Sequence, residues 1–131
     1  LTGSTGLYER LTTTEVLKYY ADLNGVSKGD FEKRKKHYYD LLDMHEFSGK
    51  RIGQLSTGMK QKVSIARTMI HNPDVVVFDE PTSGLDVITA ENIIKLIRDC
   101  KTDGKTVMDH HYHNWINRVF IWLHNVRQFT E

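Results

Sequence analysis

The sequence has 131 residues, of which 39% are hydrophobic, and a formal net charge of +1 at pH 7. This length fits one domain or part of one, and the nearly balanced charge gives no electrostatic reason to expect a nucleic-acid partner. The single cysteine, Cys100, excludes an internal disulfide, and no apolar run is long enough to suggest a membrane span. No signal peptide is visible, and because the chain begins at Leu1, within what reads as folded sequence, we expect a fragment.

No stretch of the chain matches a phosphate-binding loop, which requires Gly, four residues and then Gly-Lys-Ser/Thr. Residues 1–11 are rich in Gly, Ser and Thr, and they predict an ordinary connecting loop because Gly6 is not followed by lysine. Gly49-Lys50 is followed by arginine, and Gly104-Lys105 lacks the first glycine of the pattern. We interpret Gly104 as a helix stop instead.

Two helices are predicted between residues 12 and 43. Thr12 and Glu15 have the spacing of a capping box, and the helix that they begin is expected to close at Asn24-Gly25. The second helix is expected from about Lys28 to Asp43, and residues 44–55 are interpreted as a polar connection. The apolar positions expected to face the core are Val16, Tyr19, Tyr20, Leu23, Phe31, Tyr38, Leu41 and Leu42.

A run of charged side chains at residues 32–37 lies within the second predicted helix. Such a run is either a solvated helix face or a patch for nucleic acid or lipid head groups. We favour the solvated face, because long charged side chains cover apolar surface with their stems and keep their charged ends in water.

A helix, a strand, a second helix and a second strand are predicted after residue 55. Ser56 is a natural N-cap for a helix that ends at Asn72-Pro73, and Asp86 for a helix that ends near Gly104. Residues 74–79 predict the first strand and residues 106–108 a second short buried one. The apolar positions along the two helices are Val63, Ala66, Met69, Ile70, Ile88, Ile93, Ile94, Leu96 and Ile97.

Residues 75–86 carry the strongest functional signal. An apolar run from Val75 to Phe78 leads directly into Asp79 and Glu80, and a Pro-Thr-Ser-Gly turn follows. A continuous apolar run is typical of a parallel strand buried on both faces, and ligands of open α/β sheets bind at the C-terminal ends of such strands. A buried acid pair is costly unless a cation or a reaction uses it, so we expect chemistry here. The alternative is a solvated pair of acids at a strand end.

Residues 109–131 differ in composition from the rest of the chain. They hold His110-His111-Tyr112-His113 and both tryptophans, with few acids. Residues 119–123 fit a strand and, with Trp115 and Ile116, also fit a helix, so both interpretations stay open.

Two stretches together resemble a known family. Residues 55–61, Leu-Ser-Thr-Gly-Met-Lys-Gln, are similar to the signature motif of the nucleotide-binding domain of ABC transporters, and residues 75–86 are similar to its Walker B motif joined to the D-loop. Leu-Ser-Thr-Gly-Met variants are familiar in the ATPase subunits of sodium- and drug-exporting systems. Residues 6–12 also resemble the segment just after the Q-loop. The resemblance extends from about Leu1 to Val107.

The resemblance implies ATP and Mg²⁺ as the cofactors. Asp79, at the end of its strand, matches the carboxylate that holds the hydrated Mg²⁺ bridging the ATP phosphates. Glu80 matches the glutamate that acts on the attacking water, as general base or by orienting it.

The residues that match the signature motif are Ser56, Thr57, Gly58 and Met59. In the family this helix N-terminus contacts the γ-phosphate of ATP bound mainly to a second subunit, and a helix N-terminus favours an anion. Thr57 replaces a family glycine, and Met59 replaces a glutamine whose polar side chain is thereby lost. Ser56 alone is also explained by simple capping.

The residues that match the D-loop are Ser83, Gly84, Leu85 and Asp86. The resemblance implies that this loop makes contacts across a dimer of nucleotide-binding subunits. Taken alone, Asp86 is most simply a helix N-cap.

Three parts of the family pattern are missing or unmatched. The Walker A loop, which would precede Leu1, is absent, and no glutamine stands near Gly3, where the Q-loop would place one. His111 is the best match for the switch histidine, with His110 next. A metal site in residues 110–113 and an ordinary tail are the alternatives. A reading-frame change near Asp109 is a further hypothesis for the tail.

We therefore expect an α/β chain with a partial P-loop ATPase fold and four parts: a Q-loop-like segment (1–11), a helical subdomain (12–55), the signature helix with Walker B, the D-loop and the following helix and strand (56–108), and a divergent tail (109–131). The resemblance implies an ABC transporter ATPase subunit on the cytoplasmic face of the membrane, paired with a second copy and driving export through a separate permease. The isolated chain is expected to hydrolyse ATP weakly or not at all. The alternative is a truncated remnant or interaction module of a soluble ABC-type protein.

Overall fold

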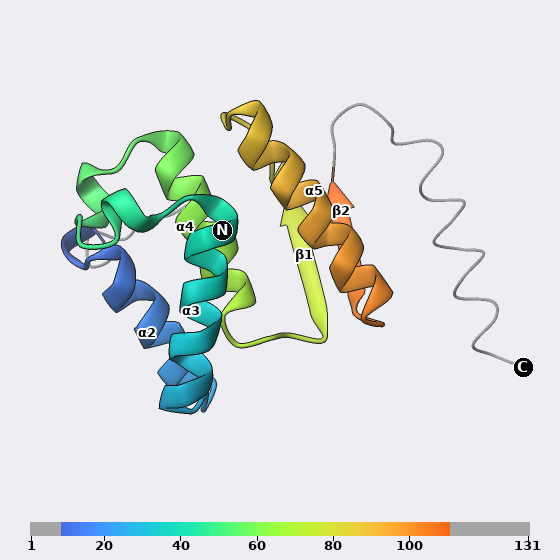
Figure 1. Ribbon diagram of the computed structural model, residues 1–131, viewed down its shortest axis with the longest axis horizontal. Coiled ribbons are helices and arrows are strands. Elements are labelled where there is room, and N and C mark those ends of the chain that lie inside the picture. Colours follow the sequence, from blue (N-terminus) through green and yellow to red (C-terminus); the bar gives the residue numbers. More distant parts are fainter. Residues whose placement is uncertain (1–8, 111–131) are drawn as a thin grey trace, which may run out of the picture.

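The computed structural model describes residues 9–110, which form a set of helices beside a two-stranded parallel sheet (Figure 1). The elements are α2 (Thr13–Leu23), α3 (Lys28–Leu42), the 3-10 turns η1 (His45–Phe47) and η2 (Ile52–Gln54), α4 (Thr57–Met69), β1 (Val75–Asp79), α5 (Val87–Thr102) and β2 (Thr106–His110). The expectations for residues 1–8 and 111–131, including the switch role of His111, lie outside the described residues.

In the helical region, residues 9–70, α2 begins where the capping signals predict. The Thr12 amide donates to Glu15 Oε2 over 2.7 Å, so the predicted capping box is confirmed. Asn24 closes α2, and Ser27 caps α3, a role that was not predicted. Glu9 and Arg10 are helical, so the prediction of a loop throughout residues 1–11 is wrong at its end.

The core of the helical region differs from the predicted one at two places. Tyr19 and Leu23 are 46% and 63% exposed, whereas Leu17 and Ala21 are fully buried. Both sets repeat with a helical period, so periodicity alone does not choose between them. Residues 44–55 are no plain polar connection, because they form η1 and η2 and bury Met44, Phe47 and Leu55 among the helices.

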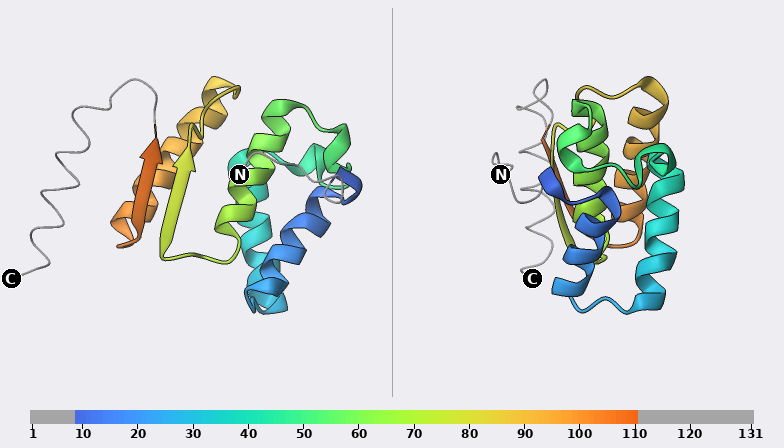
Figure 2. Two further views of the ribbon diagram at one scale, coloured as in Figure 1. Left: turned by 180° about the vertical axis from the view of Figure 1, so that it is seen from behind. Right: turned by 90° about the vertical axis from the view of Figure 1, so that its left-hand side faces the viewer.

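The sheet region, residues 71–110, is a βαβ unit. β1 and β2 pair in parallel, with Val76 opposite Val107, and α5 connects them across one face of the sheet (Figures 1 and 2). Gly104, at φ +79°, follows the end of α5, as the helix-stop interpretation predicts.

One face of this sheet is exposed. Val76 and Phe78 are buried, but Val75 and Val77 are 59% and 62% exposed, and Met108 on β2 is exposed as well. The prediction of strands buried on both faces is therefore wrong for residues 9–110. Successive side chains of a strand point to opposite faces, and the described helices cover only one of them.

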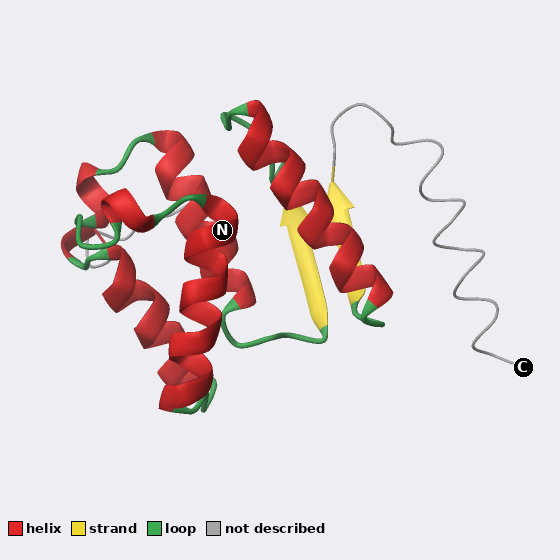
Figure 3. Cartoon of the chain, viewed as in Figure 1, coloured by secondary structure: helices red, strands yellow, loops and turns green. Residues whose placement is uncertain are grey.

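The buried side chains of the two regions form one hydrophobic core, and Figure 3 shows the helices of the helical region beside α5 and the sheet. The Asn92 side chain on α5 donates to the Leu41 carbonyl at the end of α3 over 3.0 Å. α4 belongs to the helical region, and the loop that follows it leads to the start of β1 (Figure 3).

Candidate functional site

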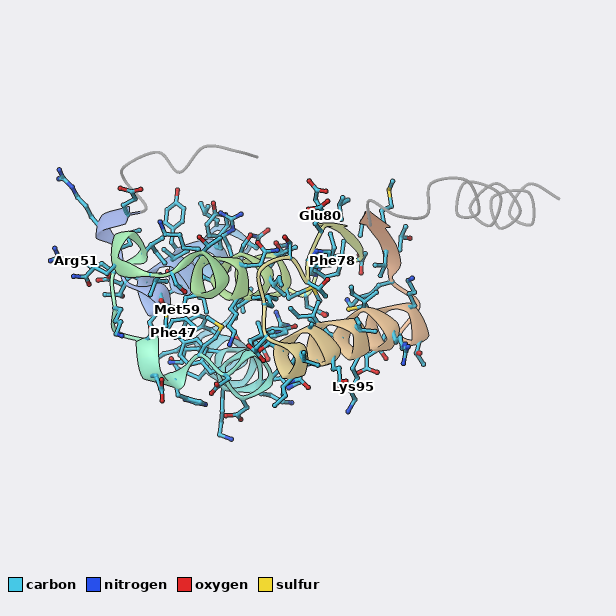
Figure 4. The ribbon with its side chains drawn as sticks, turned by 90° about the horizontal axis from the view of Figure 1, so that it is seen from above. Phe47, Arg51, Met59, Phe78, Glu80 and Lys95 are labelled. Atoms are coloured by element: carbon cyan, nitrogen blue, oxygen red, sulfur yellow. The ribbon has the colours of Figure 1, made fainter. Side chains whose placement is uncertain are left out.

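The two acids of the predicted site stand at the C-terminal end of β1. Asp79 is exposed and Glu80 is half-buried, so the expectation of a buried acid pair is wrong, and desolvation alone gives no reason for a bound cation. Glu80 has φ +44°, in the left-handed region that non-glycine residues rarely adopt. Figure 4 shows Glu80 at the end of the strand, on the side of the molecule opposite Lys95 of α5.

The acidic turn, residues 79–86, is held by its own backbone. The Ser83 amide donates to the Glu80 carbonyl over 3.0 Å, and Gly84 takes the left-handed conformation at φ +71°. Asp86 caps α5: Oδ1 accepts from the Thr89 amide and Oδ2 from the Thr89 hydroxyl. The bond from the Thr89 amide, then the one from its hydroxyl, lowers the pKa of Asp86 below its ordinary value. The N-cap interpretation of Asp86 is confirmed.

The first turn of α4 presents a helix N-terminus to solvent. Ser56 is the predicted N-cap, and its hydroxyl accepts from the Met59 amide over 3.2 Å. Ser56 and Thr57 are exposed, and Gly58 is half-buried. The Met59 side chain packs against the hydrophobic core instead (Figure 4). A methionine in place of a polar side chain therefore suits this position, because it contributes to the core.

α4 and the acidic turn are in direct contact. A methyl group added at Gly58 would come within 3.0 Å of the Gly84 carbonyl oxygen, so only glycine fits without a shift. Gln61 Nε2 donates to the Glu80 carbonyl over 3.5 Å, and Lys62 Nζ lies 3.8 Å from Asp86 Oδ2. The structure thus brings together the two stretches that the sequence analysis paired.

Gln61 and Lys62 were not among the predicted site residues. A usable signal was present, because positions three and four residues after Gly58 lie on the same face of a helix. What the sequence does not reveal is that this face points to the acidic turn.

A groove of about 240 Å³ lies between α4 and β1, lined among others by Gln61, Arg67 and Asp79. Within residues 9–110, no three His, Cys, Asp or Glu side chains lie close enough together to hold a metal ion by themselves. None of the helices described there is long and apolar enough to span a membrane.

Known proteins resemble this chain over most of its length. The family described as “ABC transporter” matches residues 3–83. The ABC transporter ATP-binding protein NatA of Bacillus subtilis is 39% identical over 106 residues, which cover 81% of this chain and 43% of NatA. The probable multidrug ABC transporter ATP-binding protein YbhF of Escherichia coli is 37% identical (79% and 18% covered), and the taurine import ATP-binding protein TauB of Roseobacter denitrificans is 33% identical (78% and 38%).

A solved structure titled “Structure of ATP binding subunit of ABC transporter” has a TM-score of 0.74 to this chain at 26% identity, and it covers 80% of this chain and 44% of the solved one. The helices and the small parallel sheet thus form part of a P-loop ATPase fold. The chain belongs to the ABC transporter family. It spans about two fifths of the length of NatA.

Proposed function

We propose that this chain is part of an ATP-hydrolysing ABC transporter subunit, in which its Walker B carboxylates serve one ATP site and its signature helix faces the ATP held by a second subunit. The observation that carries the proposal is the contact between α4 and the acidic turn, where Gly58 meets Gly84 and Gln61 meets Glu80. An exposed helix N-terminus and two carboxylates at a strand end are thereby fixed relative to each other. The first suits a phosphate, and the second suits a metal-bound phosphate and a water molecule.

Asp79 is the residue that would hold Mg²⁺, and the residues present fit that ion. Mg²⁺ is commonly bound by one or two carboxylates together with substrate phosphates and waters, so it needs no cluster of protein ligands. When bound, it would neutralise charge on the phosphates. Glu80, next in the chain, would orient the attacking water and take its proton. His111 remains our candidate for holding the γ-phosphate.

The exposed first turn of α4 would contact the γ-phosphate of ATP held by a second subunit. Ser56, Thr57 and Gly58 offer a helix N-terminus that favours an anion, and Met59 would contribute only through its backbone because its side chain is packed against the core. In the acidic turn, Ser83, Gly84 and Asp86 would face that second subunit.

We propose that the further partner is a membrane permease, which would dock at residues 12–55 on the cytoplasmic side of the membrane. We also propose that the direction of transport is export. The Leu-Ser-Thr-Gly-Met signature and the multidrug description of YbhF support export. The import description of TauB supports the opposite direction, so a transport assay with a permease that binds this subunit would decide between the two directions.

Hydrolysis in a chimera tests the proposal. The 106 residues of NatA that match this chain would be replaced with the corresponding residues of this chain. We expect phosphate release from Mg·ATP that falls by about 10²-fold or more in Glu80→Gln, as expected for loss of a general base. Glu91→Gln, an exposed acid on α5, is the control and should keep the full rate. Hydrolysis that survives Glu80→Gln would contradict the proposal.

A further inference from the structure

Glu80 has a backbone conformation that its own residue type disfavours. Its φ of +44° is uncommon for any residue with a side chain. Pro81 follows it, and a residue before proline is normally driven to extended conformations. Such a conformation persists only where the surroundings hold it.

Two donors hold the Glu80 carbonyl oxygen. One is the Ser83 amide at 3.0 Å, which belongs to the turn itself. The other is Gln61 Nε2 at 3.5 Å, which comes from the second turn of α4. Gln61 is half-buried in the groove between α4 and β1, beside Asp79 and Pro81, so its amide group is confined to this neighbourhood.

Two further contacts fix α4 against the same turn. A carbon added at Gly58 would lie only 3.0 Å from the Gly84 carbonyl oxygen, and Lys62, whose side chain is only 12% exposed, lies 3.8 Å from Asp86. Residues 58, 61 and 62 share one face of α4. Gln61 therefore lies in the middle of a surface that joins α4 to both ends of the turn after Asp79.

We propose that Gln61 is a positioning residue for Glu80. This inference rests on the proposed function, in which Glu80 acts on the attacking water. In this role Gln61 would act through Glu80 and not on the water or the phosphates directly. Its side-chain amide holds the Glu80 carbonyl, and thereby directs the Glu80 carboxylate, from the helix whose N-terminus receives the γ-phosphate.

Gln61→Met tests the proposal, because methionine keeps the length and apolar stem of glutamine but has no donor. Lys95→Met is the control: Lys95 is exposed on α5, on the side of the molecule opposite Glu80. In the full 131-residue chain, NMR would measure the amide-to-α-proton coupling of Glu80, which reports φ, and its carbonyl carbon shift. We expect both to change in Gln61→Met and to stay at wild-type values in Lys95→Met.

Kinetics of the NatA chimera give the second readout. We expect kcat to fall on the order of 10- to 100-fold in Gln61→Met, as for a displaced catalytic group, with KM for ATP and the thermal midpoint close to wild type. The control should keep kcat.

The proposal is overturned if the Glu80 coupling and carbon shift are the same in Gln61→Met as in wild type. It is also overturned if kcat is unchanged, or if kcat falls only in step with the thermal midpoint, which would mark a merely structural role. A chimera without any hydrolysis would count against the proposed function, while the NMR comparison would still decide whether Gln61 holds Glu80.

Discussion

The helical region and the sheet region bury their apolar residues to different extents. In the helical region Leu17, Leu42 and Met44 are fully buried by other helices of the chain. In the sheet region Val75 and Val77 are more than half exposed, although both belong to a strand that pairs in parallel with β2. The helical region thus buries most of its apolar side chains within the shared core, whereas the sheet region leaves one apolar face exposed. Stability is not uniform across such a chain, and the functional turn belongs to the less complete region.

The largest expected difference between the two regions is in the cost of truncating an apolar side chain. Leu42→Ala removes a fully buried side chain, so we expect it to lower the free energy of unfolding by about 2–5 kcal/mol. Val77→Ala removes a side chain that is 62% exposed and should cost no more than about 0.5 kcal/mol. Urea unfolding followed by circular dichroism measures both. Equal losses would mean that the exposed sheet face is buried in solution.

A methyl group at Gly58 should disturb the surface that joins the two regions. Gly58→Ala places a carbon 3.0 Å from the Gly84 carbonyl oxygen, and we expect about 1–3 kcal/mol of destabilisation. Gly29→Ala on α3 is the control, since nothing lies within 4 Å of the added carbon. It should be neutral or stabilise by up to about 1 kcal/mol, as alanine favours helix. If the two variants unfold alike, α4 and the turn are not in the contact described.

Loss of a helix cap should have a smaller effect, confined to the helical region. Thr12→Ala removes the hydroxyl that accepts from the Glu15 amide, and the expected cost is about 1 kcal/mol. Hydrogen exchange should quicken at the first amides of α2 and stay unchanged in α5. Faster exchange in both helices would show that the two regions unfold together.

The smallest expected effect is a pH dependence from Asp86. Its pKa is lowered from an ordinary value of 3.8, chiefly by the hydrogen bond from the Thr89 amide. A lowered folded-state pKa means that the stabilisation is complete above the unfolded value and is lost as pH falls through the folded value. Asp86→Asn keeps an acceptor but does not titrate. The stability difference between wild type and Asp86→Asn should therefore shrink below about pH 3.8. A difference that is constant with pH would contradict this assignment.

Local signals made much of the fold predictable. Thr12, Ser56 and Asp86 begin helices as their residue types predict, and Gly104 follows the end of α5. These features depend on neighbours within a few residues, which is the range over which a sequence pattern can be interpreted directly.

Burial was less predictable, because it depends on which elements cover a face. Val75 and Val77 read as core residues from their β-branched type, yet no described element packs over them. Leu23 continued the apolar stripe of α2 but stands 63% exposed near its end. A pattern shows that a face is apolar, and only the fold shows what lies against it.

The candidate site likewise has parts that the sequence predicted and parts that only the structure shows. Asp79, Glu80 and Ser56 were identified by motif resemblance, and their functional roles remain predictions. The contact of Gln61 with the Glu80 carbonyl was not predicted, because it joins residues that are far apart in the chain. The left-handed conformation of Glu80 also has no signal in its residue type, since glutamate normally avoids it.

The central claim is that this chain presents its signature helix to a nucleotide held by a second subunit. The most direct test is whether ATP drives two copies of the chimera to associate. Sedimentation of the Glu80→Gln chimera with Mg·ATP should give a dimer. Thr57→Asp adds a charge that favours the helix N-terminus but repels phosphate, so the dimer should be lost while the thermal midpoint is kept. Thr57→Asn, of the same shape without the charge, should still dimerise. A Thr57→Asp chimera that dimerises with the same ATP dependence would contradict the account.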